Sequence, residues 1–124
     1  MTEQQTIGAA FVAALAAKDQ DAIASLLAPD IDFRALTPRR VWEAGDPGQV
    51  LETLFANWFE PEDEIVELVK VETDSFADRE RVGYRLALRN PEGDFTVEQQ
   101  AYLEERDGRI GWMRVVCSGY RPAG

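Results

Sequence analysis

The stretch FVAALAAKDQDAIASLLAPDIDF, residues 11–33, predicts two helices followed directly by a strand. Apolar residues recur every three or four positions over residues 3–17, which is the spacing of one buried helix face. Asp19 is suited to cap a second short helix, and Pro29 is suited to end it. Beyond the proline, side chains alternate as in a half-buried strand: Ile31, Phe33 and Ala35 against Asp32 and Arg34.

The rest of the chain predicts one more helix and then strands. A helix is expected over residues 46–60, because Asp46 can cap it, Pro47 fits its first turn and Pro61 ends it. Residues 37–45 are expected to form a loop that carries a tryptophan. Strands separated by short turns follow: 64–75, 80–89, 95–106 and 109–120.

This order predicts a single α+β domain over residues 1–124, with three N-terminal helices packed on one face of a curved, mostly antiparallel sheet. Strands joined by short turns pair as neighbours. Helices cover only one face of such a sheet, and both faces here carry apolar residues. We therefore expect a homodimer through the sheet. The alternative is that the outer apolar residues are scattered and need no cover.

The composition argues against several classes of function. The chain has 13 basic and 23 acidic residues, a net charge of -10, which repels nucleic acid and anionic membranes. Histidine is absent, which excludes His-based triads and His metal ligands. We expect no cofactor and no metal, because the sequence has no phosphate-binding loop and no Cys-x-x-Cys pair. Cys117 is the one cysteine, and no signal peptide or membrane span is evident, so a cytoplasmic location is expected.

Residues 11–36 and 102–116 resemble the ketosteroid isomerase-like superfamily, also called nuclear transport factor 2-like or SnoaL-like. The resemblance implies the cone fold and an internal pocket. Isomerases of this family use a tyrosine on the first helix and two strand aspartates. The matching positions are Phe11, Ala35 and Gln100. Of these, only Gln100 could hydrogen-bond a ligand carbonyl, and it cannot act as an acid.

Two other mechanisms of the family also lack their residues here. Its dehydratase members need a histidine, which the chain does not have. Its epoxide hydrolase members use an Arg-x-Asp pair on a middle strand, and the corresponding residues 84–89 contain no aspartate. The resemblance therefore implies a pocket without supplying a mechanism.

Aromatic and polar side chains indicate where a ligand could bind. Phe33, Trp58 and Met113 are predicted to contact an apolar ligand, with ordinary core packing as the alternative. In the polar strand 95–106, Glu98, Gln100 and Tyr102 share one face. We expect Gln100 and Tyr102 to orient a polar ligand group inside the pocket. Glu98, if desolvated, is the candidate catalytic base. The alternative is an exposed polar strand.

The adjacent residues Arg39 and Arg40 allow two interpretations. One guanidinium could clamp a ligand carboxylate, or both could be solvated loop residues.

Three functions remain open on the sequence. The first is a pocket protein that binds a small, largely apolar molecule. The second is a cofactor-free lyase, isomerase or cyclase that works by proton transfer. The third is a protein-interaction module whose cavity is filled by its own side chains.

Overall fold

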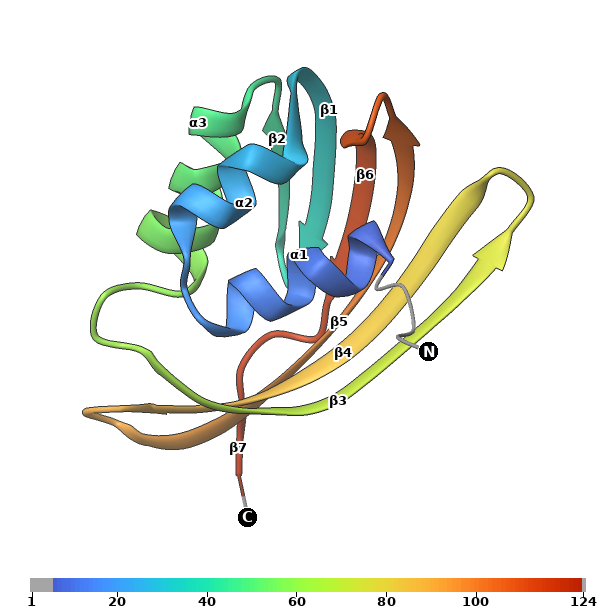
Figure 1. Cartoon of the computed structure of the whole chain (residues 1–124). Coiled ribbons are helices and arrows are strands. Elements are labelled where there is room, and N and C mark those ends of the chain that lie inside the picture. Colours follow the sequence, from blue (N-terminus) through green and yellow to red (C-terminus); the bar gives the residue numbers. More distant parts are fainter. Residues whose placement is uncertain (1–5, 124) are drawn as a thin grey trace.

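The computed structural model describes residues 6–123 and confirms the α+β fold. Helices lie on one face of a curved sheet, and the long β3–β4 hairpin extends beyond them (Figure 1). The helical segments are α1 (Ile7–Ala16), α2 (Gln20–Leu26), α3 (Pro47–Glu52) and the π-helical η1 (Thr53–Trp58). The strands are β1 (Leu27–Thr37), β2 (Arg40–Ala44), β3 (Glu64–Phe76), β4 (Arg79–Asn90), β5 (Gly93–Arg106), β6 (Arg109–Cys117) and β7 (Arg121–Pro122).

Side-chain caps set where each helix begins. The Asp19 carboxylate accepts a hydrogen bond from the Ala22 backbone N–H at 3.1 Å, as predicted for the start of α2. The Asp46 carboxylate accepts one from the Gln49 N–H at 2.8 Å at the start of α3. Helix α1 is capped by Thr6 and begins at Ile7. The predicted start of that helix at residue 3 lies outside the described residues.

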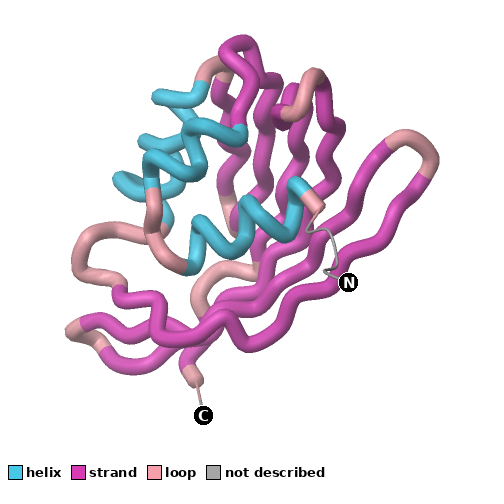
Figure 2. The backbone as a smooth tube through the Cα atoms, in the orientation of Figure 1, coloured by secondary structure: helices cyan, strands magenta, loops and turns pink. Residues whose placement is uncertain are grey.

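The strands form one sheet in the order β2-β1-β6-β5-β4-β3, with β7 paired to β5 (Figure 2). Strands β1 and β6 run parallel, and the other pairs are antiparallel. The predicted neighbour pairing of the last four long strands is confirmed.

The predicted loop over residues 37–45 is wrong, because most of it forms β2 against β1. A tight turn makes this pairing possible. Arg39 takes a positive φ of 72° within that turn, and Thr37 pairs with Arg40 across it. The pairing places Trp42 opposite Ala35.

The two faces of the sheet differ in chemistry. Helix-facing positions are buried, for example Val97, Ala101 and Leu103 on β5. The outer face carries cross-strand ion pairs instead: Arg81–Asp74 at 2.8 Å, Arg85–Glu98 at 3.1 Å and Arg114–Asp32 at 3.3 Å. The hydrophobic core therefore lies between the helices and the inner sheet face.

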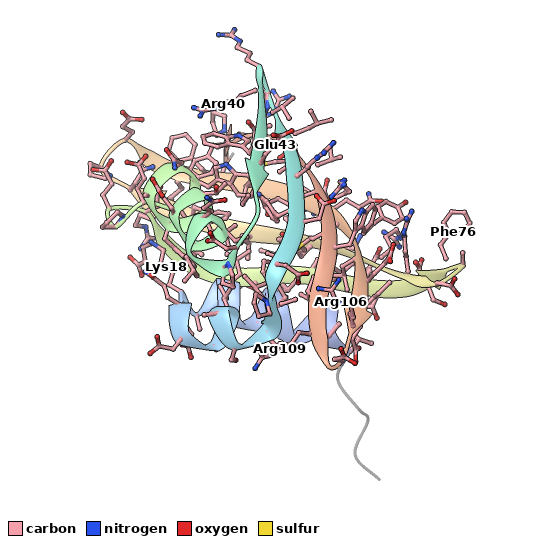
Figure 3. The ribbon with its side chains drawn as sticks, turned by 90° about the horizontal axis from the view of Figure 1, so that it is seen from above. Lys18, Arg40, Glu43, Phe76, Arg106 and Arg109 are labelled. Carbon is pink, nitrogen blue, oxygen red and sulfur yellow. The ribbon has the colours of Figure 1, made fainter. Side chains whose placement is uncertain are left out.

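The tips of the β3–β4 and β5–β6 hairpins lie away from this core. Figure 3 shows Phe76 at the tip of the β3–β4 hairpin, where it is 69% exposed. Arg106 and Arg109 flank the turn between β5 and β6. Within residues 6–123, no helix has the length and apolar character needed to cross a membrane.

Strand β6 offers a test of the two faces. Met113 is fully buried, whereas Val116 is 58% exposed. We expect Met113→Ala to lower the free energy of unfolding by about 2–5 kcal/mol, because it leaves a cavity. Val116→Ala should cost less than about 1 kcal/mol. Urea denaturation of both variants measures the difference, and similar losses would contradict the assignment of the faces.

Candidate functional site

A pocket of about 480 Å³ lies between segments that are far apart in the sequence. Residues 57–63 form one wall, the β4–β5 turn at 90–92 a second, and residues 117–120 a third. Trp42 and Gln99 contribute from β2 and β5. This volume is in the range of sites that hold small organic molecules.

Aromatic rings make up much of the pocket wall. Trp58 meets Trp42 edge-on, with ring centroids 6.1 Å apart and planes at 84°. Phe59 stacks on Tyr120 at 6.1 Å. Phe33 lies behind Trp58 in the core, with a centroid distance of 6.3 Å. The pocket therefore offers flat apolar surface to a ligand.

The π-helical turn of η1 sets this arrangement. The Phe59 N–H donates to the Leu54 carbonyl, five residues earlier, at 2.7 Å. A π turn inserts one residue into a helix, and such turns often occur at functional sites. Here consecutive side chains, Trp58 and Phe59, are both buried and both line the pocket. The sequence predicted a plain helix over residues 46–60, so this feature was missed.

A buried hydrogen bond fixes one polar group of the pocket. The Tyr84 hydroxyl donates to Gln99 Oε1 at 2.5 Å, and both residues are at least 97% buried. Burial raises the pKa of the Tyr84 hydroxyl well above its ordinary value, so it stays protonated and can serve as a donor. Because Gln99 Oε1 is the acceptor in this bond, Gln99 Nε2 remains available to donate elsewhere.

Two buried donors that belong to pocket-lining residues have no acceptor among the described residues. They are Gln99 Nε2 and Trp58 Nε1. Buried polar groups almost always have a hydrogen-bond partner, because an unpaired one costs about 1–3 kcal/mol. Both nitrogen atoms are buried, so a ligand oxygen or a water molecule could satisfy them only by entering next to them.

The carboxylate of Asp63 closes another side of the pocket. It is 5% exposed and accepts hydrogen bonds from the Glu60 N–H at 3.1 Å, Asn90 Nδ2 at 2.9 Å and the Tyr120 hydroxyl at 3.3 Å. The single Tyr120 hydroxyl hydrogen is shared between this carboxylate and the carbonyl oxygen of Trp58, which lies 2.7 Å from the hydroxyl oxygen. Burial, and next the charge of Asp63, raise the pKa of Tyr120. These contacts hold the loop after η1 in place.

Lys18 anchors the same loop from the other side. It follows α1 with a positive φ of 53°, and its ammonium donates to the backbone carbonyl of Glu60 at 2.8 Å and to that of Asp63. Partial burial lowers the pKa of Lys18, and the nearby Asp63 charge opposes that shift. In Figure 3 Lys18 lies on the helical side of the molecule.

The apolar residues predicted for the site separate into two groups. Trp58 lines the pocket. Phe33 and Met113 are 1% and 0% exposed, belong to the core and do not line the pocket. Phe33 reaches the site only through its contact with Trp58.

The polar residues predicted for the site do not line this pocket. Gln100 and Tyr102 do share a face with Glu98, but it is the outer face of the sheet. Glu98 is exposed and pairs with Arg85 at 3.1 Å, so it is not desolvated. The reason is the alternation of strand side chains: on β5 it is Gln99 that shares the inner face with Val97 and Ala101.

Several site residues were missed by the sequence reasoning. Tyr84, Gln99, Asp63 and Tyr120 had no assigned role. For Gln99 a signal existed. It lies two residues from each of the apolar residues Val97 and Ala101, so all three share one face of the strand. For Asp63 and Tyr120 there was no local signal, because their meeting depends on the path of two distant loops.

The remaining candidates lie outside the pocket. The Arg40 guanidinium stacks over Trp42, 3.7 Å from the ring centroid, and neither Arg39 nor Arg40 lines the pocket. Phe11 and Ala35 are buried in the core.

In the part of the chain that the structure describes, no group of three or more acidic or Cys side chains could hold a metal ion.

Comparisons with known proteins identify the fold. No family model matches the chain, and no curated protein matches it either. Several solved structures do match the chain. A provisionally named isomerase from Rhodopseudomonas palustris superposes with a TM-score of 0.76 at 15% identity, covering 94% of this chain and 93% of that one. An LEH-like epoxide hydrolase from M. tuberculosis gives 0.68 at 17% identity, covering 90% and 80%.

A third structure names the fold directly. It is a hypothetical protein with a ketosteroid isomerase-like fold from Catenulispora acidiphila, in complex with trimethylamine. It superposes with a TM-score of 0.69 at 15% identity, covering 94% of this chain and 88% of that one. The chain therefore has the ketosteroid isomerase-like, SnoaL-like fold that the sequence predicted.

The Tyr84–Gln99 hydrogen bond can be tested by removing one hydroxyl. Tyr84→Phe should lower the free energy of unfolding by about 1–3 kcal/mol, because it leaves the buried Gln99 Oε1 without a donor. Tyr102→Phe is the matched control, because this half-buried outer-face tyrosine makes no hydroxyl hydrogen bond with the described residues. Chemical denaturation measures both, and an equal loss would show that the buried bond adds nothing.

Proposed function

We propose that this protein binds a small, largely apolar molecule carrying one hydrogen-bond acceptor. The molecule occupies the pocket between residues 57–63, 90–92 and 117–120. Trp42 and Trp58 contact its apolar body. Gln99 Nε2 and Trp58 Nε1 donate to its acceptor, which would be a carbonyl, ether or hydroxyl oxygen.

The observation that carries this proposal is the pair of unpartnered donors on pocket-lining residues. A core that had no ligand to bind would be more stable with apolar groups at both positions. The Tyr84 hydrogen bond strengthens the argument, because it fixes which end of the Gln99 amide is engaged. The names of the superposed structures, an isomerase and an epoxide hydrolase among them, are consistent with small organic ligands.

The enzymatic alternative would need a different base from the predicted one. Glu98 is on the outer face, so it has no access to the pocket. Asp63 is the buried carboxylate of the pocket, but its three donors tie it to the surrounding loops. Binding without turnover is therefore the function that the geometry supports best.

A matched pair of ligands and a matched pair of variants test the proposal. The ligands are para-tert-butylacetophenone and para-tert-butylethylbenzene, which differ by one carbonyl oxygen. We expect the ketone to bind more tightly, and Gln99→Leu to weaken its binding about tenfold, since one hydrogen bond is worth about 1–1.5 kcal/mol. Gln100→Leu on the outer face should bind like the wild type.

Isothermal titration calorimetry gives each dissociation constant. Loss of binding in Gln100→Leu but not in Gln99→Leu would reverse the assignment of the two amides. Absence of binding for both ligands in the wild type would contradict the proposed pocket.

We further propose that the protein is a cytoplasmic homodimer that pairs through the outer face of the sheet. Leu36 lies opposite Val41 on β2 and opposite Val116 on β6. These three side chains are 52%, 60% and 58% exposed, and they form a continuous apolar patch. A second copy of the same chain would cover the patch symmetrically.

The dimer can be tested by sedimentation equilibrium. The wild type should have twice the mass of one chain, and Val116→Glu should shift the equilibrium to monomer by placing a charge in the patch. Phe76→Glu is the control, because Phe76 is equally apolar and exposed but lies at the hairpin tip. A monomeric wild type, or equal effects of the two variants, would contradict this interface.

A further inference from the structure

The charged side chains that line the pocket are all acidic. Glu60, Glu62, Asp63 and Glu92 contribute carboxylates, and no lysine or arginine is among the lining residues. Glu60 and Glu62 lie on the loop after η1, and Glu92 lies on the β4–β5 turn. The pocket mouth therefore combines negative charge from two separate segments.

Aromatic residues line the same pocket as these carboxylates. Trp58 and Phe59 directly precede Glu60, and Tyr120 hydrogen-bonds Asp63 at 3.3 Å. The face of an aromatic ring attracts cations, most strongly when the site is shielded from water. Rings and carboxylates thus favour the same sign of charge in a bound molecule.

Two basic residues near the pocket already have partners. The Lys18 ammonium donates to backbone carbonyls of the loop. The Arg40 guanidinium lies over the Trp42 ring at 3.7 Å, which shows that this ring accepts a cation. Together they offset two of the four carboxylates, so the lining stays negative.

We propose that the pocket selects an organic cation: an alkylammonium group on an apolar body that also carries the acceptor oxygen. The inference rests on the proposed function, because it concerns the same pocket. The acceptor binds Gln99 and Trp58, and the ammonium group lies toward the acidic mouth, against the aromatic rings. An anionic ligand of the same shape is repelled by the four carboxylates.

Three ligands of nearly the same shape separate the effect of charge. They are para-acetylphenyl-trimethylammonium, its neutral isostere para-tert-butylacetophenone, and the anion para-acetylbenzoate. All three keep the acetyl oxygen. We expect the cation to bind about two- to thirtyfold more tightly than the neutral ketone, the range given by cation–π contacts. The benzoate should bind more weakly than both.

Charge-matched variants locate the effect. Glu62→Gln with Glu92→Gln should weaken cation binding about three- to tenfold and change binding of the neutral ketone less, since each exposed carboxylate contributes modestly. Glu67→Gln with Asp107→Asn removes the same charge at exposed positions that do not line the pocket. This control should bind the cation like the wild type.

Each outcome bears on one of the two proposals. If the neutral ketone binds as tightly as the cation, the preference for a cation is wrong and the proposed pocket stands. If both double variants weaken cation binding equally, the whole-chain charge is responsible, and the inference fails. If none of the three ligands binds, the proposed function itself is contradicted.

Discussion

The structure depends on one constraint, the one-sided cover of a curved sheet. The helices pack on a single face, so the central strands place their buried apolar side chains on that face. Strand β5 follows this rule along its length: Val97, Ala101 and Leu103 are buried, and Glu98 and Gln100 are exposed. Shifting β5 by one residue would bury charge and expose the core.

Gln99 is a polar residue within that apolar row. It stands opposite Tyr84 across the β4–β5 ladder, and the two side chains satisfy each other in part. The nitrogen of the amide remains without an acceptor. Where a sequence breaks its own pattern at the edge of a cavity, function is the usual reason, because the break costs stability. The pocket proposal follows from this break.

Local chemistry made the order of elements predictable. Asp19 and Asp46 cap their helices as expected, and the short turns correctly predicted which late strands are neighbours. Strand β2 was missed because its pairing depends on a turn in which Arg39 takes a positive φ, which its residue type does not favour. The π turn of η1 was missed because apolar spacing does not distinguish it from an α-helix.

The site was harder to predict than the fold, because two lines of evidence pointed to different residues of β5. The family resemblance pointed to Gln100. The alternation of side chains along the strand instead places the neighbouring residue, Gln99, on the inner face. The alternation of side chains is the more reliable guide, because it is set by which side chains are buried. Burial of the apolar side chains of one strand stabilises the fold by several kcal/mol. Resemblance in a loosely related fold fixes the element but not the position within it.

The pocket is also held open before any ligand arrives. Lys18, Asp63 and Tyr120 tie the loop after η1 to α1, to the β4–β5 turn and to the segment after β6. None of these contacts uses the unpaired donors of Trp58 and Gln99. The contacts that shape the wall thus leave the two donors proposed for the ligand oxygen unoccupied. A wall ordered in this way lowers the entropic cost of binding, because the loop does not need to be fixed when the ligand enters.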